Sequence, residues 1–151
     1  MIRQFPQGFL WGAATASHQV EGNTTNDWSE WEKANAKRLA AKASSEFGHL
    51  SSWTEKFGTE AAHPENYISG IARNHYHRYE EDFESAKELN HSAHRFSIEW
   101  SRIEPKEGNF DEKELAHYQN VVRALRARNI EPFITLWHWT LPLWLAREGG
   151  I

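Results

Sequence analysis

The order of strand-like and helix-like segments constrains the fold of this chain more than any other feature of its sequence. The hydrophobic pattern predicts three strands, at 9–20, 93–100 and 131–139, and three helices, at 75–90, at 111–129 and after Pro142. Strands that alternate with helices form parallel sheets with right-handed crossover connections. The sequence therefore predicts an α/β fold made of about three βα units.

The two longer helices are indicated by apolar side chains that recur once per turn. In 75–90 the apolar face is expected to consist of Tyr76, Tyr79, Phe83 and Ala86. In 111–129 it is expected to consist of Leu115, Tyr118, Val122 and Leu125. Asp111 precedes this second helix and suits its N-cap, with Glu114 three residues later. Both helices are therefore expected to pack against a sheet through one face.

The strand at 93–100 alternates between two kinds of side chain. Phe96, Ile98 and Trp100 share one face of the strand, and Arg95, Ser97 and Glu99 share the other. An arginine inside a barrel has to be paired with an acid. We expect the partner of Arg95 to be a carboxylate on a strand that these 151 residues do not include.

The segment 23–74 has no lasting apolar period and is rich in Ser, Thr, Asn, Gly and Lys. It is predicted to be a long loop between the first strand and the first helix, with a short helix at Ala34–Ala43. The loop would carry Trp28, Trp31 and Trp53. Both a functional loop and a solvated insertion are consistent with this composition.

The number of strands points to an incomplete domain. A complete (β/α)8 barrel needs about 250 residues, and the chain has 151. We therefore interpret 1–151 as an incomplete barrel domain, the first of several βα units. The alternative is a small open doubly wound α/β domain, but the turn at 19–22 lacks the G-x-G-x-x-G pattern of such folds.

Composition narrows the function classes. The formal net charge of −4 gives no reason to expect a nucleic-acid partner. The chain has no cysteine, its histidine pairs lack a carboxylate at zinc-like spacing, and no metal or other cofactor is expected. No apolar run is long enough to span a membrane, and the first residues lack a secretory h-region, so a soluble, cytoplasmic protein is expected. Eight Trp residues fit either a large aromatic core or a site that stacks on sugars.

The predicted ends of the strands carry a polar and aromatic set. In a βα barrel the site lies at the carboxyl ends of the strands. Gln19 follows the first strand, and His138 and Trp139 follow the third. The glutamine and a neutral imidazole each donate and accept hydrogen bonds, and an indole ring can stack. This combination is typical of a site for a ligand rich in hydroxyl groups.

Four segments, in order along nearly the whole chain, resemble family 1 of the glycoside hydrolases. They are GFLWGAATASHQVEG at 8–22, HYHRY at 75–79, RFSIEWSRI at 95–103, and EPFITLWHW at 131–139 followed by Leu141 and Pro142. The resemblance implies the N-terminal portion of a (β/α)8 barrel and a retaining β-glycosidase that hydrolyses β-glucosides or β-galactosides without a cofactor. It implies that Gln19 and His138 bind hydroxyls of the terminal sugar, that Trp139 lies beside it, and that Arg95 supports the nucleophile.

The resemblance also implies two catalytic glutamates that the chain does not contain. The acid/base belongs to an Asn-Glu-Pro motif and the nucleophile to a later Glu-Asn-Gly motif, and neither occurs here. Glu104 precedes a proline but lacks the asparagine, and Glu21 and Glu99 match neither role. Thr140 stands where many members have Asp. No catalytic carboxylate is therefore assigned within 1–151, and the chain alone is expected to be inactive. The alternatives are a non-catalytic carbohydrate-binding protein and a half-barrel completed by a partner chain.

Overall fold

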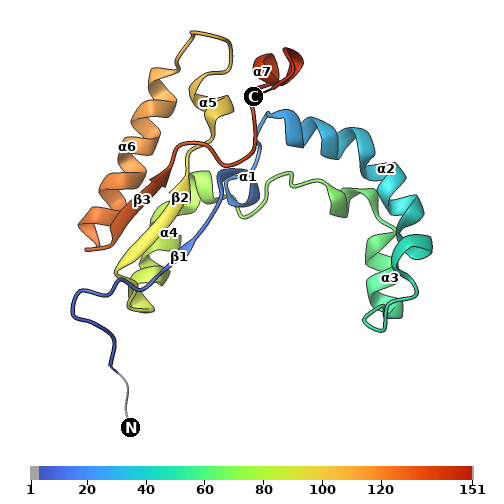
Figure 1. The fold of residues 1–151 in the computed structure, drawn as a ribbon, viewed down its shortest axis with the longest axis horizontal. Coiled ribbons are helices and arrows are strands. Elements are labelled where there is room, and N and C mark those ends of the chain that lie inside the picture. The colour runs from blue at the N-terminus through green and yellow to red at the C-terminus, as the bar shows by residue number, and fades with distance from the viewer. Residues whose placement is uncertain (1–3, 151) are drawn as a thin grey trace.

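A computed structural model describes residues 4–150 of the chain (Figure 1). The elements in chain order are β1 (Gly12–Ala14), α1 (Ser17–Val20), α2 (Asp27–Phe47), α3 (Glu55–Ala61), the 3-10 turn η1 (Pro64–Tyr67), α4 (His75–Glu88), β2 (Ala93–Ser97), α5 (Trp100–Ile103), α6 (Glu112–Ala127), β3 (Glu131–Thr135) and α7 (Leu143–Arg147).

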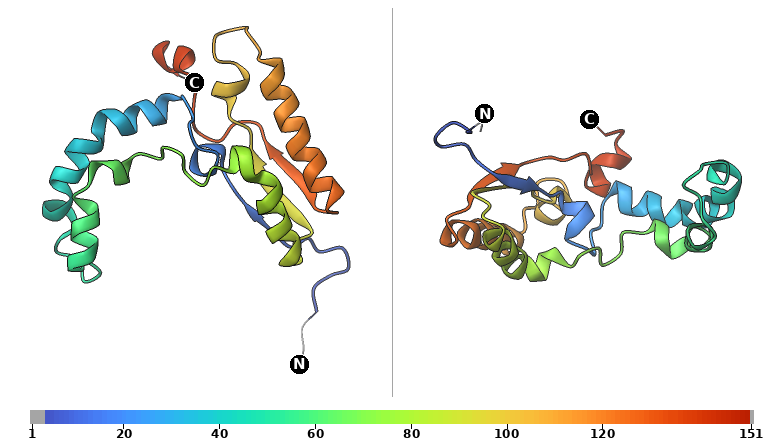
Figure 2. Two further views of the ribbon diagram at one scale, coloured as in Figure 1. Left: turned by 180° about the vertical axis from the view of Figure 1, so that it is seen from behind. Right: turned by 90° about the horizontal axis from the view of Figure 1, so that it is seen from below.

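The three strands form one parallel sheet in the order β1-β2-β3. Ala93 of β2 lies opposite Gly12 of β1 on one side and opposite Glu131 of β3 on the other. Figure 2 shows that α4 and α6 lie on the same face of this sheet, and no helix of residues 4–150 covers the opposite face. A doubly wound domain has helices on both faces, whereas a barrel has them only outside. The arrangement therefore favours the barrel over the doubly wound alternative.

The apolar core lies between the sheet and helices α4 and α6. Its buried members come from both helices, from β2 and from the segments beside it: Phe83, Ala86, Phe96, Ile103, Tyr118, Val121, Ala124, Leu125 and Ile130. Ile98 and Leu115 pack against this cluster. The predicted apolar faces of both helices are thus largely confirmed. Tyr76 is the exception, because its ring stacks on His117 and its hydroxyl donates to Glu114.

The strands are shorter than the sequence predicts. Trp100 was expected to continue the second strand, but the chain leaves the sheet after Ser97 and Trp100 begins α5. The first strand ends at Ala14, and the chain turns into α1 at Ser17. Gly12 is required in β1, because a Cβ there would overlap the carbonyl group of Ala93. Polar residues that follow each strand are thereby grouped at one edge of the sheet.

The prediction of a loop for 23–74 is wrong for a large part of that segment. Helix α2 has 21 residues and extends well beyond the expected Ala34–Ala43, and α3 and η1 follow it. The buried positions of α2 are small or polar: Ser29, Glu32, Ala36, Ala40 and Ala43. They recur at helical spacing but supply no large apolar side chain, so hydropathy gives no helical period. Trp28 and Trp31 consequently lie in the first turns of a helix.

Candidate functional site

The residues after the carboxyl ends of the strands form an open pocket of about 650 Å³. The structure brings together all three side chains predicted to bind substrate: Gln19, His138 and Trp139. The pocket is also lined by Ala16, His18, Asp27, Trp28, Glu32, Ser69 and Thr140. Gln19 and His138 are more than a hundred positions apart in the sequence. Their convergence follows from the parallel sheet, which places the ends of all strands at one edge.

Gln19 is placed by the short helix α1. The Ser17 backbone N–H donates to the Ser97 hydroxyl at 2.8 Å, which fixes the start of the helix to the end of β2. Ser17 and His18 point into the protein and are buried, whereas Gln19 is exposed and faces the pocket. The Gln19 amide is therefore available to a ligand, with both its donor and its acceptor.

His138 and Trp139 are placed by a tight turn after β3. The Thr140 backbone N–H donates to the His138 carbonyl at 3.0 Å. Trp139 has a left-handed φ of 73° and its side chain is 78% exposed. A large residue in this region carries a cost of order 1–3 kcal/mol and persists only where its surroundings enforce it. The turn thus holds an indole ring out toward the pocket at the expense of local stability.

The Glu99 carboxylate accepts hydrogen bonds from several of the elements that form the site. Its carboxylate is completely buried and accepts hydrogen bonds from the hydroxyl of Ser17 at 3.0 Å, the amide of Asn26 at 3.2 Å and the hydroxyl of Ser101 at 2.7 Å. The Thr140 hydroxyl lies 3.4 Å away. These donors come from α1, from the N-cap of α2, from α5 and from the turn that carries Trp139. Glu99 therefore connects the elements that bear the pocket residues, without lining the pocket itself.

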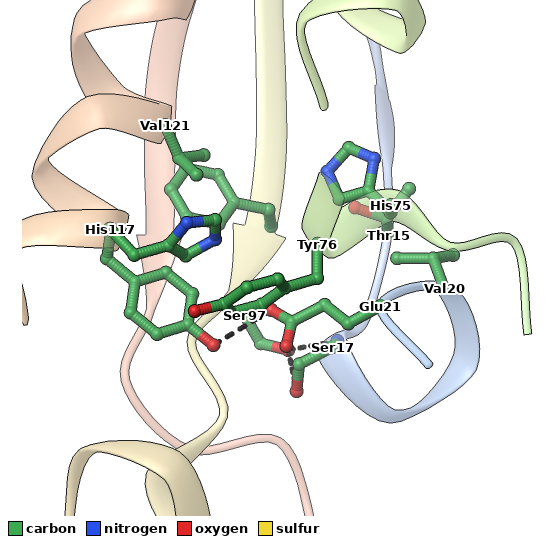
Figure 3. A pocket seen from close by; sticks show the side chains of 11 residues that line it. Thr15, Ser17, Val20, Glu21, His75, Tyr76, Ser97, His117 and Val121 are labelled. Atoms are coloured by element: carbon green, nitrogen blue, oxygen red, sulfur yellow. Dashed lines mark hydrogen bonds between the residues drawn. The ribbon is translucent and has the colours of Figure 1, made fainter. Parts of the chain in front are cut away.

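A second buried carboxylate, Glu21, also does not line the open pocket. Figure 3 shows it pointing from α1 into a small space bounded by β2, α4 and α6, near Tyr76 and Ser97. It pairs with Arg102 at 2.9 Å and accepts from the Tyr118 hydroxyl at 2.9 Å. Burial outweighs these two partners and raises the pKa of Glu21 to about 7. The enclosed volume of about 10 Å³ has room for about one water molecule, so this space is part of the packing and not a substrate site.

Arg95 lies on the central strand β2 and is half-buried. Its guanidinium donates to the Thr15 carbonyl at 3.5 Å, and none of the ion pairs among residues 4–150 includes it. The carboxylate partner expected for Arg95 is thus not among the described residues, and pairing with an acid elsewhere stays a prediction.

Between residues 4 and 150, no three His, Cys, Asp or Glu side chains are arranged to hold a metal ion. None of the helices described here is long and apolar enough to cross a membrane.

Several pocket residues were not anticipated as site residues. Asp27 and Trp28 lie at the start of α2, in the segment predicted to be a loop. Glu32 and Ser69 also line the pocket, where the Ser69 hydroxyl donates to the Glu32 carboxylate at 2.7 Å. The Asn26 and Ser29 pair, a capping box, could have revealed the start of α2, although not its place beside the pocket.

Comparison with known proteins identifies the class of protein that this fold and pocket define. The model of glycosyl hydrolase family 1 matches residues 1–151, and the chain belongs to that family. A 1,4-β-D-glucan glucohydrolase of Thermotoga neapolitana is 37% identical over 99% of the chain. A β-glucosidase of Agrobacterium is 38% identical over 99% of the chain. The chain spans about 30% of the length of these relatives, 31% and 29% respectively.

Solved structures agree with the family assignment. A β-glycosidase from Pyrococcus horikoshii superposes with a TM-score of 0.74 at 36% identity, over 97% of this chain and 28% of that one. The β-glucosidase of Thermotoga maritima in complex with a calystegine derivative gives a TM-score of 0.71 at 31% identity, over 99% of this chain and 30% of that one. The predicted fold class, an α/β fold that forms the first units of a (β/α)8 barrel, is therefore confirmed.

Proposed function

We propose that residues 1–151 form the sugar-binding part of a retaining β-glycosidase that acts on β-glucosides or β-galactosides. The observation that carries this proposal is the convergence of Gln19, His138 and Trp139 in one pocket at the carboxyl edge of the sheet. Hydroxyl groups of a terminal sugar would bond to the amide and the imidazole, and the apolar face of the sugar ring would pack on the indole. Membership of family 1 and the names of the relatives support the same conclusion.

The reaction itself would need carboxylates from outside these residues. A retaining glycosidase uses an acid/base and a nucleophile whose carboxyl groups lie about 5–5.5 Å apart. The chain contains no Asn-Glu-Pro motif, and the buried Glu99 and Glu21 are already occupied by structural partners. We infer that both catalytic carboxylates are supplied by sequence beyond residues 1–151. Arg95 would then pair with the nucleophile, since its guanidinium has donors to spare.

The first test is the kinetics of the full-length protein that contains these residues. Gln19→Ala and His138→Ala should each lower kcat/KM for an aryl β-glucoside or β-galactoside by about 100-fold, because each removes bonds that strengthen in the transition state. Gln119→Ala and His49→Ala are matched controls, since both residues are exposed and lie outside the pocket. Unchanged kcat/KM in the two pocket variants would contradict the proposal.

A second test concerns the 151-residue chain by itself. If the two carboxylates lie elsewhere, this chain should show no measurable turnover of aryl β-glycosides. Sequencing of the gene beyond codon 151 should then reveal an Asn-Glu-Pro motif. Robust hydrolysis by the isolated chain would refute the inference that the catalytic acids are outside it.

The edges of the sheet favour completion by further strands. β1 and β3 are edge strands, and Phe133 and Ile134 of β3 are each about half exposed, at 48% and 46%. Unpaired edges with exposed apolar side chains associate readily. The proposed barrel would cover them with later strands of the same protein, and a half-barrel with a partner chain would cover them by association. Sedimentation of the full-length protein separates the two, because only the second requires an oligomer.

A further inference from the structure

We infer that Glu99 is a positioning residue of the proposed sugar site, and that its carboxylate fixes the places of Gln19 and Trp139 without touching the substrate. Glu99 is completely buried and does not line the pocket. Its effect on sugar binding therefore passes through the elements to which it is bonded. This inference rests on the proposed function and deepens it, because it concerns what fixes the geometry of that same site.

One oxygen of the Glu99 carboxylate lies between the two elements that carry predicted sugar-binding side chains. Oε2 accepts from the Ser17 hydroxyl at 3.0 Å and from the Thr140 hydroxyl at 3.4 Å. Ser17 begins α1 and stands two residues before Gln19. Thr140 directly follows Trp139. A change at Oε2 therefore acts on both sides of the proposed site at once.

The other oxygen of Glu99 bonds to different elements. Oε1 accepts from the Asn26 amide at 3.2 Å and from the Ser101 hydroxyl at 2.7 Å. Asn26 is the N-cap of α2, and Ser101 belongs to α5, which carries none of the residues that line the pocket. Ser17 and Ser101 are both buried, with exposed fractions of 3% and 7%. The two serines thus make the same kind of bond to one carboxylate, but only Ser17 belongs to an element of the site.

The neighbours of Glu99 are arranged to donate to it. The Ser97 hydroxyl accepts from the Ser17 backbone N–H at 2.8 Å and donates to the Ser17 hydroxyl at 3.1 Å, which leaves the Ser17 proton for Glu99. The Asn26 side-chain oxygen accepts from the Ser29 N–H at 2.8 Å, so its N–H2 group faces Glu99. A carboxylate only accepts, and it satisfies all these donors, whereas a glutamine would turn an N–H2 group toward one of them.

The turn after β3 depends on restraints of this kind. Trp139 has a left-handed φ of 73°, a conformation that persists only where the surroundings enforce it. The Thr140 hydroxyl bond to Glu99 is one restraint on this turn. The other is the pair of bonds between Leu141 and Asp27, at 2.8 and 3.0 Å, which joins the turn to the start of α2. Since the N-cap of α2 also bonds to Glu99, the carboxylate reaches the turn by both routes.

The test compares two serine variants in the full-length protein that contains these residues. Ser17→Ala and Ser101→Ala each remove one buried hydroxyl bond to Glu99 and should lower the denaturation midpoint by similar amounts. Only Ser17→Ala should lower kcat/KM for an aryl β-glucoside or β-galactoside, by about 3-fold to 10-fold. Ser101→Ala should change kcat/KM by less than about 2-fold. The dissociation constant of 1-deoxynojirimycin or its galacto isomer, whichever binds better, should rise in Ser17→Ala alone.

A third variant measures the carboxylate itself. In Glu99→Gln the remaining oxygen is expected to stay with Asn26, so the new N–H2 group faces Ser17 and Thr140. This variant should lower kcat/KM by about 10-fold to 30-fold, because it displaces both sides of the site. The double variant with Ser17→Ala should lose no more than Glu99→Gln alone, since the same bond is already absent. Circular dichroism at the assay temperature checks that each variant is folded, and the two serine variants decide the question if Glu99→Gln is not.

The outcomes separate this inference from the proposed function. Equal losses of kcat/KM in Ser17→Ala and Ser101→Ala would mean that Glu99 contributes to stability only, and would overturn the positioning role. No loss in Ser17→Ala, or additive losses in the double variant, would overturn it as well. In each of these cases the wild-type protein remains an active glycosidase. A wild-type protein that neither hydrolyses aryl β-glycosides nor binds an iminosugar would remove the proposed function, and the positioning role with it.

Discussion

Helices α2 and α6 are both long and both begin at a capped turn, yet different contacts hold them in place. Helix α6 contributes Tyr118, Val121 and Leu125 to the apolar core between helices and sheet. Helix α2 buries alanines and polar side chains, and its largest exposed groups are Trp28 and Trp31. Its first turns are fixed by hydrogen bonds, among them Asn26 to Glu99 at 3.2 Å.

This difference distinguishes the apolar layer on the sheet from the region that lines the pocket. The helices that pack on the sheet gain stability from apolar burial, which tolerates imprecise geometry. The start of α2 depends on directional bonds to Glu99, His18 and Leu141, which fix position more sharply. The side chains that line the pocket come largely from the region held by hydrogen bonds.

The largest loss of stability is expected in the apolar layer. Leu125 is completely buried, so Leu125→Ala should lower the free energy of unfolding by about 2–5 kcal/mol through lost burial and a residual cavity. Ala40→Gly, at a buried position of α2, should cost only about 1 kcal/mol through helix propensity. Chemical denaturation measures both. Similar losses of the free energy of unfolding would mean that the same kind of contact stabilises both helices.

Glu99→Ala should cost about 2–4 kcal/mol, because it leaves buried donors on Ser17, Asn26 and Ser101 without their acceptor. Glu99→Gln should cost less, since it keeps one acceptor oxygen. Amide hydrogen exchange should speed up at the start of α2 and in the turn after β3 together. Faster exchange confined to β2 would show that Glu99 does not join the two regions.

The N-cap residues of α2 and α6, Asn26 and Asp111, can be compared by the same substitution. Asn26 accepts from the Ser29 N–H at 2.8 Å, and Asp111 accepts from the Lys113 N–H at 2.8 Å. Asp111→Ala should cost about 1 kcal/mol, within the usual range for a cap. Asn26→Ala should cost slightly more, about 1–2 kcal/mol, because its amide also donates to Glu99. Equal losses of free energy of unfolding would argue that the Asn26–Glu99 bond adds nothing.

A pH dependence of stability is expected at the junction of the two regions. The pKa of Glu21 is raised from 4.5 to about 7, so between these values the folded state keeps a proton that the unfolded state releases. Stability should therefore fall as the pH rises through this window, by at most about 1.4 kcal/mol per pH unit. Glu21→Gln cannot ionise and should flatten the profile between pH 4.5 and about 7. An unchanged slope in this variant would show that another group is responsible.

The same contrast explains what the sequence could predict. The sequence predicts helices α4 and α6 and strands β2 and β3 within a few residues. Each of these helices has apolar side chains at helical spacing, such as Phe83 in α4 and Leu125 in α6, and β2 has an alternating set that includes Phe96. The existence of α2 as a long helix was missed because Ala36, Ala40 and Ala43 leave no hydrophobic period. Helix propensity predicts only the middle of α2, at Ala34–Ala43.

For the pocket, position along the strands is sufficient to bring three of the predicted residues together, but it does not predict the other residues that line it. Gln19, His138 and Trp139 follow strand ends, so the parallel sheet brings them to one pocket. Asp27 and Trp28 reach the pocket through the hydrogen bonds between Asp27 and Leu141, which lie 114 residues apart in the chain. No local pattern in the sequence encodes such a long-range pair.

The most direct test of the central claim is a crystal structure of the full-length protein with a bound iminosugar such as 1-deoxynojirimycin. The account predicts that its hydroxyl groups lie within hydrogen-bond distance of the side chains of Gln19 and His138, with the ring beside Trp139. An iminosugar bound elsewhere, with these three side chains free of contact, would contradict it.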